Sequence, residues 1–264
     1  MSKKIALLMI DPQNDFTDKR GALFVAGADS DMDRLATFIG KNQNRLTEIY
    51  CTLDSHDPVH IAHPIFWVNS KGEHPTPFTL ITEDDVKNGV WRTYNPKWQS
   101  RGQAYVEALK KNGRYVLCIW PPHCLIGSWG ASVNPLVHAA ITKWAYETFD
   151  RVNWVTKGSN LFSEHYSALA ADVPDDDDPS TKLNTALIDT LTDADEILIT
   201  GEALSHCVAS SIRDIAAQFG IDQVQKFTLL EDTSSNVGGF EKLGQDFVKE
   251  MVKKGMKITR TTDW

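Results

Sequence analysis

One cysteine lies where the sequence changes from a strand pattern to a helix pattern. The apolar run EILIT (196–200) ends just before GEALSHCVASSIRD (201–214), whose second half is typical of an amphipathic helix. Cys207 is therefore predicted near a helix N-terminus, where the helix dipole and free backbone N–H groups favour a thiolate. Such a thiolate could be a nucleophile, although a free cysteine is more often a small buried apolar residue.

Two residues could assist this thiol, and each also follows a predicted strand. Asp11 ends the run KIALLMID, and Lys157 closes RVNWVTKG. A nearby lysine would lower the pKa of the thiol further, and a carboxylate could take and return its proton. Taken alone, an Asp before proline usually caps a turn, and a Lys after a strand is usually a surface residue. Only their meeting at one edge of a sheet would make them a site.

A second set of side chains has the composition of a metal site. Asp54 and His56 form a D-x-H pattern at the end of a predicted strand, and His123 occurs later in WPPHC. One carboxylate and two imidazoles suit Zn²⁺, or Fe²⁺ and Mn²⁺, and leave positions open for water or substrate. His60 and His63 are near enough in sequence to be further ligands or to support them, although histidine-rich loops are often only polar surface.

The pattern of apolar residues predicts how these groups are positioned. Short apolar runs alternate with amphipathic stretches, and the runs are nearly continuous. This pattern favours a mostly parallel central sheet of about six strands covered by helices on both faces. In such α/β folds the ligand site lies beyond the carboxyl ends of the strands. The predicted strands are 4–11, 47–54, 114–120, 151–158, 196–202, 224–232 and 256–261, and the predicted helices lie near 30–45, 99–112, 131–144, 180–192, 207–219 and 239–254.

Composition excludes several classes of protein. The formal net charge is −8 with scattered Lys and Arg, which argues against nucleic acid as a partner. The apolar runs are too short to cross a membrane. The N-terminal MSKK leads directly into a strand pattern, so we expect no signal peptide. Four cysteines without C-x-x-C spacing indicate neither a disulfide scaffold nor structural zinc, and favour a reduced, cytoplasmic setting.

Five motifs together resemble the isochorismatase-like cysteine hydrolases, and most of all their nicotinamidase/pyrazinamidase branch. The resemblance covers about residues 4–60 and 114–261, with every motif in the same order as in that family. The motifs are DPQNDF (11–16), TLDSHDP (52–58), WPPHC (120–124), TKG followed by YSAL (156–169), and GEALSHCV (201–208).

The resemblance implies a role for each catalytic candidate. Cys207 would attack an amide carbonyl, Asp11 would take the thiol proton and give it to departing ammonia, and Lys157 would stabilise the thiolate. A thioester would then be hydrolysed by water. The oxyanion would be bound by the backbone N–H groups of Cys207 and Ala203, with a cis peptide bond between Glu202 and Ala203.

The same resemblance implies a cofactor and a substrate. Asp54, His56 and His123 would bind one divalent transition metal, zinc first and iron or manganese as alternatives, with His60 as an additional ligand. Phe16 and Trp120 would flank the ring of a small heteroaromatic amide, because aromatic slots suit flat rings; core packing is their alternative role. The implied enzyme is a cytoplasmic homo-oligomer that hydrolyses nicotinamide.

Two features depart from the family pattern. About 60 residues separate the D-x-H motif from WPPHC, so residues 1–264 are predicted to be one domain with an insertion at about 64–113. This segment could be a lid, a pocket wall or a subunit contact. The second departure is Ser205-His206, where relatives often have an acidic or Thr-Asp pair; we interpret His206 as a buried neighbour of Cys207. The loop VPDDDDPS (173–180) is interpreted as solvated, with calcium binding as a minor alternative.

Three alternatives to a nicotinamidase stay open. The chain could hydrolyse another small amide of the ureido, carbamoyl or maleamate type, for which relatives tend to lack the metal ligands. Isochorismatase itself is disfavoured because it does not need the cysteine. A scaffold that retained the fold without activity is a third possibility.

Overall fold

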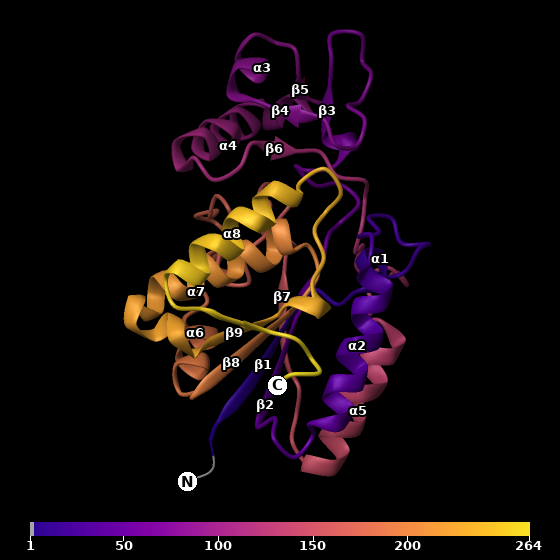
Figure 1. Cartoon of the computed structure of the whole chain (residues 1–264). Helices are drawn as coiled ribbons and strands as arrows, with labels where there is room; N and C mark the ends of the chain where they lie inside the picture. Colours follow the sequence, from indigo (N-terminus) through magenta and orange to yellow (C-terminus); the bar gives the residue numbers. More distant parts are fainter. Residues whose placement is uncertain (1–2) are drawn as a thin grey trace.

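A six-stranded parallel sheet forms the centre of the molecule (Figure 1). The computed structural model of the chain describes residues 3–264, apart from the side chains of residues 221 and 222. The order of the strands across the sheet is β10-β9-β8-β1-β2-β7. Their bounds are β1 (Ile5–Ile10), β2 (Glu48–Asp54), β7 (Asn153–Lys157), β8 (Glu196–Gly201), β9 (Phe227–Leu230) and β10 (Lys257–Thr259).

Helices cover both faces of this sheet, and the alternation of side chains along β1 shows why. Ile5, Leu7 and Met9 pack against α2 and α5, whereas Ala6, Leu8 and Ile10 belong to the core beneath α6, α7 and α8. Successive side chains of a strand point to opposite faces, so an entirely apolar strand must be covered on both. The helices are α1 (Asn14–Thr17), α2 (Ala28–Lys41), α5 (Pro135–Thr148), α6 (Thr185–Thr192), α7 (Ala209–Phe219) and α8 (Glu241–Lys253).

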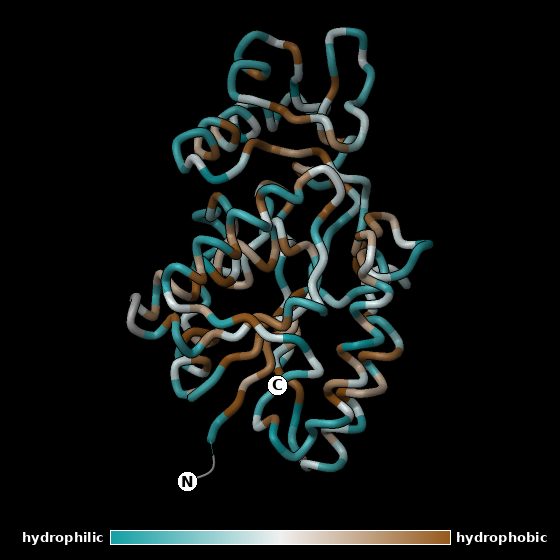
Figure 2. The backbone as a smooth tube through the Cα atoms, in the orientation of Figure 1, coloured by the Kyte–Doolittle hydropathy of each residue, from teal (hydrophilic) through white to brown (hydrophobic). Residues whose placement is uncertain are grey.

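The predicted α/β class and its parallel central sheet are confirmed. Figure 2 shows hydrophobic residues along the central strands and more hydrophilic residues on the outer loops. Within residues 3–264, none of the helices combines the length and the apolar character that a membrane-spanning segment needs.

Residues 64–118 form a separate layer above the carboxyl ends of the strands, which we call the upper lobe (Figure 1). It contains two small antiparallel sheets, β3–β5 and β4–β6. The description of this region as an insertion in a single domain stays a prediction. Its elements are β3 (Trp67–Val68), β4 (Leu80–Ile81), α3 (Glu83–Lys87), β5 (Arg92–Thr93), α4 (Gln99–Asn112) and β6 (Leu117–Cys118).

The prediction that residues 114–120 join the central sheet is wrong. Only Leu117 and Cys118 form a strand, β6, and they pair with β4 of the upper lobe. Helix α4 ends at Asn112 within the lobe, so the apolar run after it meets the edge of β4 first. The segment still delivers WPPHC to the carboxyl ends of the central strands, but as a loop.

Candidate active site

Four adjacent strands place the candidate residues at one edge of the sheet. Asp11 follows β1, Asp54 ends β2, Lys157 ends β7, and Cys207 lies a few residues after β8. The strand order β8-β1-β2-β7 makes these carboxyl ends neighbours. The chain builds outward from β1 in one direction and later returns to the other side at β8. The gap between β1 and β8 is therefore the point at which α/β sheets bind ligands.

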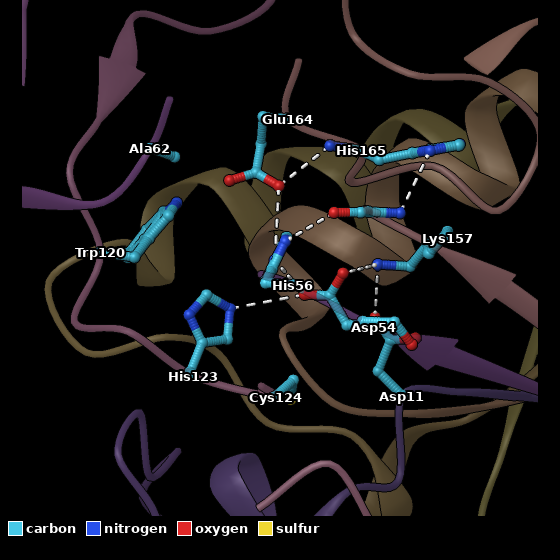
Figure 3. A network of polar contacts seen from close by, with 12 residues as sticks. Asp11, Asp54, His56, Ala62, Trp120, His123, Cys124, Lys157, Glu164 and His165 are labelled. Atoms are coloured by element: carbon cyan, nitrogen blue, oxygen red, sulfur yellow. Dashed lines mark hydrogen bonds and ion pairs between the residues drawn. The ribbon is translucent and has the colours of Figure 1, made fainter. Parts of the chain in front are cut away.

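The structure brings Asp11, Lys157 and Cys207 together around the lysine ammonium. Lys157 Nζ lies 2.9 Å from Asp11 Oδ2 and 3.7 Å from Cys207 Sγ. The same ammonium lies 3.2 Å from Asp54 Oδ1, so it also reaches the second set of residues (Figure 3). Asp11 is held in place by Thr52, whose hydroxyl donates to Oδ1 at 2.5 Å and accepts from the Asp11 N–H at 3.0 Å.

The charges in this cluster decide which protons are bound. Burial alone would lower the pKa of Lys157, but the negative charges of Asp11 and Asp54 outweigh burial and raise that pKa well above its ordinary value. Lys157 is therefore an ammonium ion. Burial also opposes ionisation of Asp54, yet the charges of His56 and Lys157 prevail and hold its pKa well below its usual range.

The expectation of a thiolate with a lowered pKa is wrong for these residues alone. Burial raises the pKa of the Cys207 thiol, and Asp11 and Asp54 raise it further, so Lys157 cannot compensate. The thiol is almost completely buried beside two carboxylates, and this burial outweighs the effect of the helix dipole. Cys207 is thus a thiol next to a carboxylate, which can accept its proton when the sulfur attacks.

The turn that presents Cys207 contains two left-handed residues. Gly201 has φ +117° and Ala203 has φ +57°, and the next residues, Leu204–Val208, form a single π-helical turn before α7. Single π-helical turns of this kind are frequently found at functional sites. No peptide bond among residues 3–264 is cis, so the predicted cis bond at Glu202–Ala203 is wrong; the left-handed conformations turn the chain instead.

The predicted oxyanion donor at Ala203 is compatible with this turn. The N–H groups of Glu202, Leu204 and His206 donate to backbone carbonyls, whereas that of Ala203 has no backbone partner among the described residues. A free N–H beside the nucleophile can bind a developing negative charge. The role of the Cys207 N–H stays a prediction.

The three predicted metal ligands also converge. Asp54 Oδ2 lies 3.0 Å from His56 Nε2 and 3.4 Å from His123 Nε2, and all three side chains are buried (Figure 3). The other ring nitrogens face carbonyl oxygens: His56 Nδ1 lies 2.8 Å from Gly158 O, and His123 Nδ1 lies 2.9 Å from Pro121 O. A proton on each Nδ1 leaves each Nε2 lone pair directed at Asp54.

This donor set fits a divalent metal ion. Ligand atoms about 2.0–2.1 Å from one tetrahedral ion lie about 3.3 Å apart, which is close to the separations from Asp54 Oδ2. Carbonyl oxygens that accept from the second ring nitrogen are the usual partners of metal-binding histidines. Without a metal, burial opposes protonation of His56, but the negative charge of Asp54 outweighs burial and raises the pKa of the imidazole to about 9. The site thus attracts positive charge.

His60 lies beside these ligands but is engaged elsewhere. Its ring is centred 4.4 Å from that of His56. Its Nε2 lies 3.2 Å from Ser163 O and its Nδ1 accepts from the Ala62 N–H at 3.2 Å, so both nitrogens face the backbone. His60 also forms, with His56 and Glu164, a second group of buried side chains whose potential ligand atoms all lie within 4.8 Å of one another. Its role as a ligand stays a prediction, and the observed contacts favour support of the loop.

Two further acidic residues of the site, Glu164 and Asp15, were not predicted from the sequence. Glu164 is buried, with Oε1 3.9 Å from His56 Nε2 and Oε2 without a hydrogen-bond partner among the described residues (Figure 3). Asp15 accepts from the Cys124 N–H at 2.6 Å, next to His123. Both lie within or just before motifs that had been recognised, DPQNDF and YSAL, so acidic residues in those motifs were the available signal.

The aromatic candidates line the same region. The ring of Phe16 packs edge-on against His123 at 5.3 Å. Trp120 donates from Nε1 to the Tyr166 hydroxyl at 2.9 Å and contacts the His206 ring at 5.3 Å. His206 is buried among these rings, so its interpretation as a buried neighbour of Cys207 is confirmed. Contact with substrate stays a prediction for both Phe16 and Trp120.

Comparison with known proteins now adds to this geometry. No model of a known protein family matches the chain. The nicotinamidase of Escherichia coli is 26% identical over 262 residues, covering 98% of this chain and 96% of that protein. The structure of the yeast nicotinamidase Pnc1p matches with a TM-score of 0.63 at 18% identity, covering 97% of this chain and 99% of that one. The chain has the nicotinamidase fold.

A third match concerns the metal. The pyrazinamidase of Pyrococcus horikoshii, whose structure is a complex with zinc, has a TM-score of 0.56 at 19% identity, covering 97% of this chain and 99% of that one. The resemblance to the nicotinamidase/pyrazinamidase branch that the motifs predicted is thereby confirmed. These nicotinamidase-like proteins match almost the whole chain rather than only the motif regions.

Proposed function

We propose that this protein is a metal-containing cysteine amidohydrolase that converts nicotinamide and water into nicotinate and ammonia. The observation that supports this most directly is the position of the Lys157 ammonium, which lies between Asp11 and Asp54 and beside Cys207. This one ammonium connects the nucleophile Cys207 and its proton acceptor Asp11 with the donor set around Asp54, which suits a metal ion. The full-length similarity to nicotinamidases supports the choice of substrate.

The chemistry begins with the thiol. Cys207 Sγ attacks the amide carbonyl carbon, and the thiol proton passes to Asp11. The backbone N–H of Ala203 stabilises the negative oxygen. Collapse of the tetrahedral adduct breaks the C–N bond, and Asp11 returns its proton to the departing nitrogen, which leaves as ammonia. Lys157 stays charged throughout and stabilises each anion that forms beside it.

The second half of the reaction uses the same groups. A thioester now joins the acyl group to Cys207. Asp11 is again a carboxylate and takes a proton from water as that water attacks the thioester carbonyl. Breaking of the C–S bond releases the carboxylic acid, and the proton returns to the sulfur. The cycle is balanced without a redox step.

Asp54, His56 and His123 would hold the metal, for which we propose zinc, with iron or manganese as alternatives. When bound, the metal supplies a Lewis acid for the ring nitrogen of the substrate and positive charge that offsets the two carboxylates. Phe16 and Trp120 would flank the ring. We retain as part of this proposal a cytoplasmic homo-oligomer without nucleic-acid or membrane partners.

The test is ammonia release from nicotinamide by purified, metal-loaded protein. We expect wild-type turnover, and a loss of roughly a thousandfold or more in Cys207→Ala, because the nucleophile acts as a unit with its proton acceptor. Cys51→Ala is the matched control, since Cys51 is also a buried free thiol but packs with the α2 and α5 side of the core. Substantial activity in Cys207→Ala would end the covalent mechanism.

The alternatives give different results in the same assay. Turnover of a ureido, carbamoyl or maleamate substrate instead of nicotinamide would indicate another small-amide hydrolase. Purified protein without a bound transition metal would favour that alternative. Absence of turnover with every substrate, from protein that contains metal, would indicate a scaffold.

A further inference from the structure

Trp120 is surrounded by aromatic rings, and one of them comes from the upper lobe. Tyr166 and His206 approach Trp120 from within the core, and both are buried. Phe240, from the loop before α8, is partly buried at 5.9 Å. Phe78 contacts Trp120 edge-on, with ring centres 5.8 Å apart and planes at 87°. Phe78 is 50% exposed, so it covers Trp120 on the solvent side.

The backbone of the upper lobe holds Phe78 in this place. The Phe78 N–H donates to Ile119 O at 2.5 Å, and the Ile119 N–H donates to Thr79 O at 2.9 Å. These bonds continue the β4–β6 pairing up to the residue before Trp120. Phe78 also has φ +70°, a backbone conformation that residues other than glycine rarely adopt. Backbone bonding therefore fixes an exposed aromatic residue at an unfavourable angle beside the candidate site.

Contacts inside the core hold the Trp120 ring in place. Its Nε1 is hydrogen-bonded to Tyr166, and the His206 ring packs perpendicular to it at 5.3 Å. Cys207 and Trp120 are only 4% and 2% exposed. A ligand that reaches the thiol must therefore bind beneath the side chains that cover these two residues. Among the rings around Trp120, Phe78 is the most exposed and belongs to a different layer of the fold.

We propose that Phe78 determines specificity by closing the solvent side of the aromatic slot beside Trp120, so that unsubstituted heteroaromatic amides are accepted and ring-substituted ones are rejected. This inference rests on the proposed function for the identity of the substrate. It assigns to the upper lobe the role of a pocket wall. The discrimination is steric, and the chemistry at Cys207 is unchanged.

The first experiment compares nicotinamide with 5-methyl- and 6-methylnicotinamide. Phe78→Ala should raise kcat/KM for a methylated amide relative to nicotinamide by roughly tenfold or more, as expected when one methyl group no longer clashes. Phe78→Trp should keep or increase the discrimination. The backbone bonds of residue 78 do not involve the ring, so these variants should fold, which equal thermal midpoints would verify.

Leu80→Ala is the matched control. Leu80 lies two residues further along the same segment and is also 50% exposed, but it pairs with Cys118 rather than reaching Trp120. Its discrimination ratio should equal that of the wild type. If Phe78→Ala shows the same ratio as Leu80→Ala with both methylated amides, Phe78 does not determine specificity.

A second readout does not depend on the substrate. Cys207 is alkylated with iodoacetamide and with the bulkier N-phenylmaleimide, and modification of its peptide is followed by mass spectrometry. Phe78→Ala should accelerate the bulky reagent selectively, whereas Leu80→Ala should not. If the wild type releases no ammonia from nicotinamide, the proposed function fails. The ratio of the two alkylation rates, N-phenylmaleimide over iodoacetamide, still decides whether Phe78 controls access to Cys207. Equal rate ratios in wild type and Phe78→Ala would overturn the proposal.

Discussion

Lys157 shows how much one side chain contributes to this site. Its ammonium is within 3.2 Å of carboxylate oxygens from both Asp11 and Asp54. Removing the lysine charge would leave two buried carboxylates facing each other without a counter-ion, and breaking a buried pair in this way is strongly unfavourable. The lysine is therefore needed to neutralise the buried carboxylates, in addition to any effect on the sulfur.

His206 illustrates a residue whose effect should be on stability as a function of pH. It is buried among aromatic rings, and its Nδ1 lies 3.0 Å from the Ser205 hydroxyl. Burial lowers the pKa of His206 to about 4, and Glu164 opposes this only weakly. The folded protein thus leaves His206 neutral at pH values where the unfolded chain, with an ordinary pKa of about 6.5, takes up a proton.

The sign of the pH effect follows from this difference. Between about pH 6.5 and about pH 4 the unfolded state binds more protons, so the free energy of unfolding falls as the pH falls. We expect the contribution of His206 to this loss to be about 3 kcal/mol between pH 7 and pH 4. Urea unfolding of wild type and His206→Gln at several pH values measures it. The free energy of unfolding of His206→Gln should depend less steeply on pH than that of the wild type. The control is the same change at the exposed His138, which should leave the pH dependence of the wild type unchanged. Equal pH dependence in His206→Gln and the wild type would contradict the assignment.

At the scale of elements, the close approach of β8 to β1 determines where Cys207 is placed. Gly201 is the last residue of β8 and pairs with Ile10, the residue before Asp11. A Cβ atom at Gly201 would lie 2.0 Å from Ile10 O, and φ is +117°. Only glycine fits both the angle and the contact. The turn to Cys207 therefore depends on a single missing side chain.

Gly201→Ala should consequently destabilise the fold and displace the nucleophile. The strained φ and the collision with the β1 backbone together should cost roughly 2–5 kcal/mol, measured by urea unfolding at neutral pH. Gly238→Ala is the matched control, because a Cβ there meets no atom within 4 Å and its φ is not in the left-handed range. An unfolding midpoint of Gly201→Ala equal to that of Gly238→Ala would contradict this prediction. It would show that β8 and β1 can move apart at this position without a loss of stability.

Over the whole molecule, the sequence predicted what depends on residue type and period. The apolar strands, the helices between them and the meeting of Asp11, Lys157 and Cys207 follow from patterning and from the geometry of parallel sheets. Residues 114–120 were misplaced because an apolar run does not reveal which sheet edge it will meet. The pKa of Cys207 depends on burial and on carboxylates that are distant in sequence, which the local pattern does not reveal. Whether the Glu202–Ala203 peptide bond is cis or trans depends on the backbone angles of the turn, which the local pattern does not reveal either.

The candidate metal site joins the two ends of the upper lobe to the sheet. Asp54 and His56 precede the lobe and His123 follows it, yet their ligand atoms lie 3.0 and 3.4 Å apart. A metal bound there connects both ends of a long segment to the end of β2. Unfolding would separate these ligands, so metal binding should stabilise the entire fold rather than the loop alone.

Chelation should therefore lower the thermal midpoint, and zinc should restore it. At a metal concentration about 100 times Kd, binding adds about 2.7 kcal/mol to the free energy of unfolding, which for a chain of this length corresponds to a shift of roughly 5–10 °C. Asp54→Asn should abolish the zinc-dependent shift, because it removes the charge that both imidazoles face. Asp246→Asn, which changes an exposed carboxylate on α8, should retain it. A thermal midpoint that responds neither to chelator nor to zinc in the wild type would mean that these three side chains do not hold a metal, whatever their spacing.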